Sequence, residues 1–434
     1  MATSRRRDFL KAAGAAGFMT ASAGAAPAQD TSAVRIGIVG VGHRGTAHVQ
    51  TLLDVPGVEI PAICDINEEH LARAAGIVEQ AGRRRPDGYA KGVEDFRRLC
   101  AREDLDAVLT ATPWEWHTPI CVAAMKAGKY AATEVPAAIT VEECWELVET
   151  SEKTGRPCMI LENSCYNRNV LLVLNMIRLG IFGELLHAEG GYQHDIRLGD
   201  KVNSQGEVQW RGMHAVKRNG NLYPTHPIGP ISWWMNINRG DRFTYLVSMS
   251  TPSLGINHYV AKHVSPTHPN ATREFALGDI NTTLIKTEKG LTVTLYHDTQ
   301  TPRPYDLILR VQGTEAIYMM TLDKIYVDGR SPVEKGKPVW EELEPYYAQY
   351  EHPLWKRLGN TTGKYPHGPI DYMVVQQFIE AVRAKSQPPI DVYDAATWSV
   401  ISPLTERSVA TRSAAVDFPD FTRGKWNARR PVYA

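Results

Sequence analysis

The segment that most constrains the fold is VRIGIVGVGHRGTAHVQTLL, residues 34–53. Its first six residues form a short β-branched run, which predicts a buried strand of a parallel sheet. Gly40, Gly42 and Gly45 follow in the spacing G-x-G-x-x-G, and a helical pattern comes after them. Glycines at this spacing permit a tight turn and let the backbone approach a pyrophosphate, which the amino end of the helix would hold. This order is typical of a dinucleotide-binding domain.

An acidic residue supports this interpretation. A second predicted strand, VEIPAICD, ends in Asp65, twenty residues beyond Gly45. A carboxylate at this place accepts hydrogen bonds from the adenosine ribose and repels a 2′-phosphate. The sequence therefore favours NAD over NADP. A glycine-rich turn without a ligand is the alternative, and the combination of strands, helix and acid makes it the weaker one.

Strands and helices continue to alternate as far as residue 163. Further strands are predicted in DLDAVLTATP, KYAATEVP and PCMILEN, with helices between them. Such alternation indicates a doubly wound parallel sheet, which binds its ligand at the carboxyl ends of the strands. Loop or core packing is the alternative role for each residue at those ends. As candidates for the cofactor site we name Trp114, Glu115, Trp116, His117, Glu134, Val135 and Asn163.

The pattern changes after Asn163. Segments rich in Thr, Val and Tyr follow a helix in NVLLVLNMIRLGIFG, and they predict an open, mostly antiparallel sheet. A helix is expected in GPISWWMNINRG, ending at Gly240, and the stretch 331–366 is expected to be irregular. Two late helices are expected, the second kinked at Pro403.

The expected fold is therefore α/β with two domains. A Rossmann domain with a doubly wound parallel sheet is expected at residues 31–163, and an α+β domain for substrate binding or oligomerisation at residues 164–434. The open sheet of the second domain is a candidate to cover the active site or to pair subunits in a homo-oligomer. The C-terminal helices are candidates to pack back on the Rossmann domain.

The first thirty residues differ from the rest of the chain. Arg6 and Arg7 are followed by Asp-Phe-Leu-Lys, an Ala- and Gly-rich apolar run, and the small residues Ala26-Pro27-Ala28. This order is typical of a twin-arginine signal peptide, so we expect residues 1–30 to be one and the protein to be periplasmic or secreted, exported folded. A disordered basic tail is the alternative.

Composition excludes several classes of protein. Lys plus Arg and Asp plus Glu both number 48, which gives no electrostatic reason to expect nucleic acid or an anionic membrane as a partner. Beyond the N-terminus the sequence has no apolar run long enough for a membrane span. Histidines and acids fall in no metal-binding pattern, so no metal is expected. The six cysteines form no C-x-x-C pair, and we expect reduced, buried thiols.

The second half carries candidates for proton transfer. They lie in the segments GGYQHD, QWRGMH, NGNLYPTHPIGP and TPRPYD. For any one of them taken alone a structural role is at least an equal alternative; a histidine between prolines, for example, can simply stabilise a turn. The candidates are Tyr192, His194, Arg211, Tyr223, His226 and Tyr305.

Several motifs together resemble a known family. WEWH, TEVPAA, ILENSCYNR, IFGELLHAEGGYQHD, GNLYPTH and NINRGDRF occur in order, and with them the chain resembles glycoside hydrolase family 109, the NAD-dependent α-N-acetylgalactosaminidases. That family lies within the group of glucose–fructose oxidoreductase and inositol dehydrogenase. Simple dehydrogenases of the group usually carry Glu-Lys-Pro where this chain has Glu134-Val135-Pro136, which disfavours a plain dehydrogenase. The family often has glycine where this chain has Pro227.

The resemblance implies a set of site residues. It implies NAD contacts from the glycine turn with His43 and Arg44, from Asp65, from the strand ends named above, and from Tyr223. Of the contacting residues, His226 and Tyr223 are the candidates for proton transfer. The implied sugar contacts are Tyr192, Arg211, Tyr223, Pro224, Thr225, His226 and Tyr305.

The resemblance also implies an activity. The substrate would be a small glycoside with a terminal N-acetylgalactosamine-type sugar, expected to be α-linked. Hydride would pass from C3 of the sugar to NAD⁺, the C2 proton would be removed, the C1–oxygen bond would break by elimination, water would add, and hydride would return. Two other functions compete: a periplasmic NAD-dependent sugar oxidoreductase, and a noncatalytic sugar-binding protein.

Overall fold

The computed structural model describes residues 33–361 and 365–433. The signal peptide predicted for residues 1–30 lies outside these ranges. Among the helices that are described, none is both long and apolar enough to cross a membrane. The six cysteines are all buried and free, as the sequence predicts.

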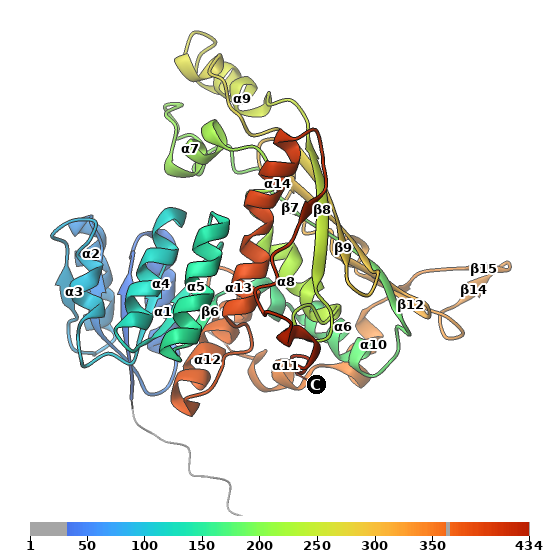
Figure 1. Cartoon of the computed structure of the whole chain (residues 1–434), viewed down its shortest axis with the longest axis horizontal. Helices are drawn as coiled ribbons and strands as arrows, with labels where there is room; N and C mark the ends of the chain where they lie inside the picture. Colours follow the sequence, from blue (N-terminus) through green and yellow to red (C-terminus); the bar gives the residue numbers. More distant parts are fainter. Residues whose placement is uncertain (1–32, 362–364, 434) are drawn as a thin grey trace, which may run out of the picture. The chain divides into compact units, whose positions relative to one another are not determined.

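The first half of the chain forms a parallel six-stranded sheet in the order β3-β2-β1-β4-β5-β6. Its helices α1 to α5 are labelled on the left of Figure 1. Its central strands are fully buried because helices cover both faces. The predicted doubly wound sheet is confirmed. The strands are β1 Val34–Val39, β2 Val58–Cys64, β3 Asp87–Tyr89, β4 Ala107–Thr110, β5 Tyr130–Thr133 and β6 Cys158–Ile160, and the helices are α1 His43–Asp54, α2 Glu68–Gln80, α3 Phe96–Cys100, α4 His117–Lys126 and α5 Val141–Thr154.

The turn between β1 and α1 depends on glycine at two positions. Gly40 has a φ of +81°, a left-handed conformation that side chains rarely adopt. A Cβ atom on Gly45 would lie 1.8 Å from the carbonyl oxygen of Gly40. The first turn of α1 can therefore pack directly on the end of β1, which places the amino end of the helix at the edge of the sheet.

The second half builds a nine-stranded sheet in the order β16-β13-β12-β11-β7-β10-β9-β8-β17. All neighbours are antiparallel except β7 and β10, so the prediction of a mostly antiparallel sheet is confirmed. The strands are β7 Leu185–Gln193, β8 Phe243–Ser250, β9 Ile280–Thr287, β10 Thr292–Asp298, β11 Arg310–Gly313, β12 Ala316–Met319, β13 Lys324–Val327, β16 Glu341–Glu342 and β17 Val416–Asp417, and a separate hairpin joins β14 Val333–Glu334 to β15 Lys337–Pro338.

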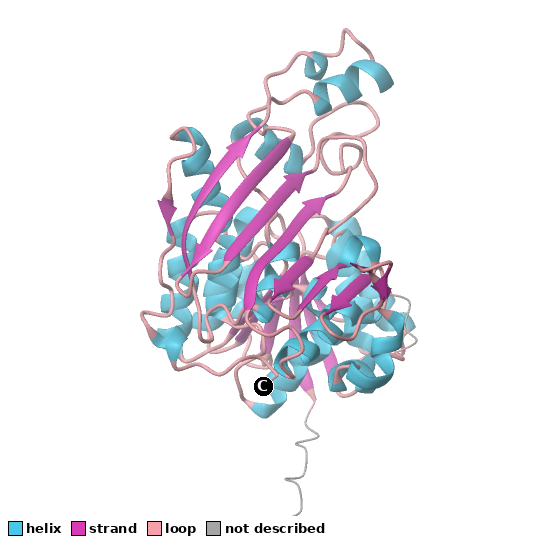
Figure 2. Ribbon diagram, turned by 90° about the vertical axis from the view of Figure 1, so that its right-hand side faces the viewer, coloured by secondary structure: helices cyan, strands magenta, loops and turns pink. Residues whose placement is uncertain are grey.

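The outer face of this sheet is turned to the viewer in Figure 2, with helices behind it. Strand alternation places Tyr245, Met249, Ile280 and Leu284 on that face, where all four are exposed. An apolar face of this kind suits contact with another protein surface. Pairing of subunits through it stays a prediction, which a measurement of the mass in solution would test.

The remaining helices cover the inner face or reach back to the first half. Gly190 on β7 packs under Pro227 and Ile231 of α8. Helix α12 packs against α1, and α13 packs against α5 and β6. These helices are α6 Arg168–Arg178, α7 Trp210–Lys217, α8 Thr225–Trp234, α9 Gly255–His263, α10 Glu344–Tyr350, α11 Pro353–Leu358, α12 Pro369–Ala384, α13 Val392–Ser399 and α14 Ile401–Ala410.

Three local predictions are corrected by the structure. Helix α8 begins at Thr225, inside a segment expected to be a loop, and it ends at Trp234 rather than Gly240. Pro227 is compatible with this start because N–H groups in the first turn have no partner within the helix. The stretch expected to be irregular contains α10 and α11. The late helix breaks at Val400, and Pro403 lies in the first turn of α14 instead of at a kink.

Close packing at the glycine turn leads to a stability prediction. Gly45→Ala should destabilise the protein by several kcal/mol, because its methyl group would overlap backbone atoms that cannot move without opening the turn. Gly76→Ala, within α2 and with nothing within 4 Å of the added carbon, should instead stabilise it by about 0.5–1 kcal/mol. Chemical denaturation of both variants measures the difference. Equal effects of the two substitutions would contradict this account.

Candidate cofactor and sugar site

A cavity of about 570 Å³ lies against the glycine turn. Residues of the second half, Asp200, Trp210 and Arg211, complete its lining. Six of the residues predicted to bind the cofactor lie together on this lining: Gly40, Gly42, His43, Arg44, Asp65 and Trp116.

The lining fits an NAD molecule. A Cβ atom on Gly42 would meet only the His70 ring, at 3.7 Å, so bare backbone faces the cavity there. No side chain in the described part of the chain caps α1, which leaves its first N–H groups free for a phosphate. Asp65 is held at the end of β2 by hydrogen bonds of 2.8 Å from the N–H groups of Val41 and Asn67. Its carboxylate is thus fixed where a ribose would lie.

Other predicted cofactor residues lie behind the lining. Gly45 packs on Gly40, and Trp114 and Val135 are buried. His117 is buried between the carbonyl groups of Thr112 and Pro136, at 2.8 and 2.7 Å, and so shapes the loop after β4. Glu115 instead points toward His214, at 3.6 Å. NAD contacts from these residues stay predictions.

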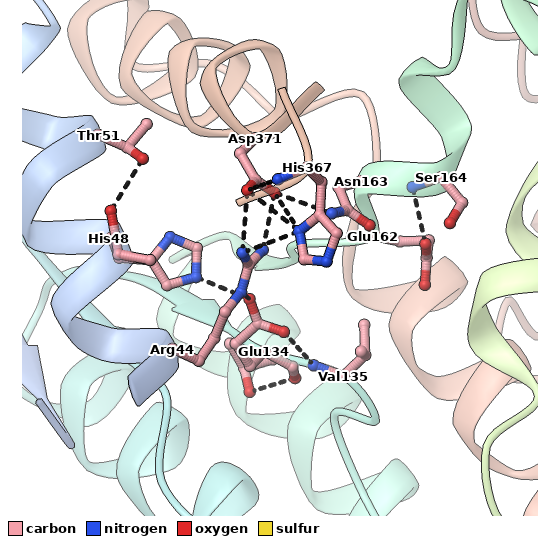
Figure 3. A network of polar contacts seen from close by, with 12 residues as sticks. Arg44, His48, Thr51, Glu134, Val135, Glu162, Asn163, Ser164, His367 and Asp371 are labelled. Atoms are coloured by element: carbon pink, nitrogen blue, oxygen red, sulfur yellow. Dashed lines mark hydrogen bonds and ion pairs between the residues drawn. The ribbon is translucent and has the colours of Figure 1, made fainter. Parts of the chain in front are cut away.

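Glu134 and Asn163, at the ends of β5 and β6, belong to one polar network with Arg44 (Figure 3). The Arg44 Nε donates to Glu134 at 2.6 Å, and its two terminal nitrogens reach Asp371 at 3.1 Å each. His48 contacts the same Glu134 oxygen at 2.7 Å. The positive charge of Arg44 holds the pKa of Glu134 well below its usual range although the carboxyl is buried.

Aromatic side chains from both halves build the candidate sugar site. The Tyr223 ring stacks on Trp114, with centroids 5.6 Å apart, and lies 4.6 Å from Tyr192. Arg211 lies over Tyr223 at 5.3 Å and lines the NAD cavity as well. Tyr305 is more exposed, with its centroid 6.1 Å from Tyr192. Four of the predicted sugar residues are therefore brought together beside the cofactor cavity.

Burial keeps the two inner tyrosines protonated. Desolvation raises the pKa of Tyr192 to about 12 and that of Tyr223 well above its usual range, and the charge of Arg211 only partly offsets this. Near neutral pH both hydroxyl groups are neutral and can donate a hydrogen bond.

Thr225 differs from what was expected of a sugar contact: it is fully buried and its hydroxyl has no partner among the described residues. Pro224 precedes it as the cap of α8.

His226 is oriented by a carboxylate that sequence reasoning did not name as a site residue. Its Nδ1 lies 2.7 Å from Oε1 of Glu162, which is fully buried at the end of β6. The N–H of Ser164 also donates to this oxygen, at 2.9 Å. A carboxylate at Nδ1 favours the proton there and leaves Nε2 as the acceptor. His226 lies 5.1 Å from Tyr223 and 5.4 Å from Tyr192, ring to ring.

Lys201 is a second residue that the sequence did not reveal. It is 2% exposed and lines a small cavity of about 10 Å³, enough for one water molecule, together with Tyr192, Arg211 and Tyr223. Burial, with repulsion from Arg211, lowers the pKa of Lys201 to about 7. Neighbouring His297 is also buried, and its pKa is lowered to about 3. A weakly basic amine therefore lies beside Tyr192 and Tyr223 of the candidate sugar site.

Two family models match the chain, one on each half. The model of the oxidoreductase family with the NAD-binding Rossmann fold covers residues 34–162. The model of the glycosyl hydrolase 109 C-terminal domain covers residues 166–428. Fold, cavity and matches define the class as a glycoside hydrolase whose cofactor is NAD. The chain belongs to glycoside hydrolase family 109.

Similar proteins extend this result over the full length. A glycosyl hydrolase family 109 protein of Stenotrophomonas maltophilia is 41% identical over 99% of this chain and 98% of its own. A protein of Tannerella forsythia named alpha-N-acetylgalactosaminidase is 43% identical, over 92% of this chain and 89% of its own.

Among solved structures, the fold resembles that of myo-inositol dehydrogenase from Lactobacillus casei in complex with NAD(H) and myo-inositol. The TM-score is 0.61 at 18% identity, over 90% of this chain and 99% of that chain. A likeness at this identity shows the fold alone.

Burial of Lys201 has a measurable consequence for stability. Its pKa is about 7 in the folded protein, against an ordinary lysine value of 10.5, so between these values the unfolded chain binds the extra proton and stability rises with pH. Relative to Lys201→Met, the wild type should gain about 4 kcal/mol of unfolding free energy from pH 7 to pH 10. Denaturant titrations at several pH values measure it. The exposed Lys126→Met should show no such difference; a parallel pH profile for Lys201→Met would refute the argument.

Proposed function

We propose that the protein hydrolyses small glycosides with a terminal, α-linked N-acetylgalactosamine through a cycle of oxidation, elimination, hydration and reduction. The name of the Tannerella forsythia relative supports the sugar. The observation that carries the proposal is a histidine oriented by buried Glu162 and flanked by two protonated tyrosines, next to an NAD cavity. These groups suit removal of a proton from carbon, whereas ordinary glycosidases rely on a pair of carboxylates.

Each residue has a role that its surroundings support. Bound NAD would supply a reversible hydride acceptor. The free Nε2 of His226 would take the proton from C2, and Glu162 would stabilise the positive charge that the ring then carries. Tyr223 and Tyr192 would donate hydrogen bonds to sugar oxygens. Arg211, which lines both cavities, would stabilise negative charge that develops on the sugar.

An assay of products tests the function. An aryl α-N-acetylgalactosaminide should release its aglycone with no net accumulation of NADH, and in deuterated water the product should carry deuterium at C2. Matched β-linked and non-acetylated glycosides measure the preference for anomer and sugar. Formation of NADH in proportion to consumed sugar, without release of the aglycone, would establish the sugar oxidoreductase instead.

Two substitutions test the histidine with its carboxylate. Glu162→Gln keeps the size of the side chain but removes the charge, and kcat should fall about 100-fold, while His226→Ala should lose about 1000-fold or more. Both variants should retain NAD, because neither residue lines its cavity. Turnover at the wild-type rate in His226→Ala would rule out its role in proton transfer.

We also propose export through the twin-arginine pathway to the periplasm or beyond. The order of twin arginine, apolar run and Ala-Pro-Ala supports it. Replacing Arg6 and Arg7 together by lysine should leave the protein in the cytoplasm, which cell fractionation measures. Arg5→Lys, just outside the pair, should be exported normally. Unchanged export of the double variant would contradict the proposal.

A further inference from the structure

Asp371 lies in the first turn of α12, far in sequence from every motif of the NAD-binding half. Its side chain is 2% exposed, yet both oxygens are fully used (Figure 3). One accepts from Arg44 at 3.1 Å and from the amide of Asn163 at 2.8 Å. The other accepts from Arg44 at 3.1 Å and from the backbone N–H of His367 at 3.1 Å. A buried carboxylate with this many donors is held in one orientation.

The partners of Asp371 come from separate elements, and one of them, Arg44, lines the cofactor cavity. Arg44 belongs to the glycine turn and lines the cavity, and Asn163 follows β6. Asp65 marks the adenosine half at β2, so the nicotinamide half is expected over β4, β5 and β6, where Asn163 and Glu134 lie. Asp371 thus ties residues on the nicotinamide side of the cavity to a helix from the C-terminal segment.

The network also carries excess negative charge. Arg44 contributes one positive charge between the carboxylates of Glu134 and Asp371. Burial would raise the pKa of Asp371, but the hydrogen bond with the His367 side chain and the charge of Arg44 hold it well below its usual range. Burial lowers the pKa of His48, which keeps it neutral. Two carboxylates therefore share one guanidinium, so negative side chains outnumber positive ones among Arg44, Glu134 and Asp371. Oxidised nicotinamide is positively charged and reduced nicotinamide is not, so such a field favours the oxidised form.

We propose that Asp371 is a positioning residue for the cofactor: it fixes Arg44 and Asn163 beside the nicotinamide half and biases the site toward NAD⁺ over NADH. The bias suits an enzyme that must begin each cycle with the oxidised cofactor. The proposal rests on the NAD binding of the family and not on which sugar is cleaved. Failure of the sugar assay would therefore leave it standing.

Cofactor binding measured separately from turnover tests this role. Purified holoenzyme is dialysed, the retained NAD is released and quantified, and NAD⁺ and NADH are then titrated back at pH 8. Asp371→Asn preserves the shape but removes the charge, and it should weaken NAD⁺ about 10-fold and NADH about threefold, as expected for loss of one nearby charge. The Asp371→Glu variant, which keeps the charge, should restore the preference for NAD⁺.

A matched control separates positioning from general stability. Asp394 forms a buried, two-point ion pair with Arg239, at 2.6 and 2.7 Å, outside the cavity lining. Asp394→Asn should lower the melting temperature but leave the ratio of the two dissociation constants unchanged. Equal weakening of NAD⁺ and NADH in Asp371→Asn, or no weakening, would overturn the proposal. So would an Asp371→Glu variant that folds but lacks the preference.

Discussion

The guanidinium of Arg44, held between Glu134 and Asp371, is the interaction on which the rest of the site depends. Arg44 lies between Gly42 and Gly45 of the phosphate turn, so its ion pairs anchor that turn directly. One carboxylate comes from the parallel sheet and the other from a helix nearly 240 residues later (371 − 134 = 237). Breaking such a buried pair on one side is strongly unfavourable, because a charge is left without compensation. The ion pairs therefore hold the cofactor cavity and the C-terminal segment in a single arrangement.

This arrangement explains how a hydrolase can be built on the fold of a dehydrogenase. The Glu-Val-Pro motif places buried Val135 where a lysine is usual in simple dehydrogenases of the group, so the proton-handling groups must come from elsewhere. In the mechanism that we propose, they come from His226 at the start of α8 and from Glu162 at the end of β6. The aromatic cluster formed by Trp114, Tyr192 and Tyr223 contacts His226 through both tyrosines, and Arg211 next to it lines the cofactor cavity.

The parts that could be predicted from sequence are those determined by neighbours in the chain. The glycine turn and Asp65 depend on local backbone geometry, and strand alternation follows from short-range patterns. Glu162 and Asp371 acquire their roles only from contacts with His226 and Arg44, 64 and 327 residues away. Lys201 looks like any surface lysine until tertiary packing buries it. The start of α8 was hidden because prolines suggest a loop, although the cap and the first turn accept Pro224 and Pro227, and the helix continues through Pro230.

The stacking of Tyr223 on Trp114 has a consequence for how this family can change over evolution. Trp114 is supplied by the nucleotide-binding half, and Tyr223 by the half that carries the other sugar candidates. The aromatic stack of the candidate sugar site is thus built from two modules, and an exchange of one module between relatives would change only one side of it. New specificities should arise by substitutions that change both modules together, rather than by recombination at the boundary between them.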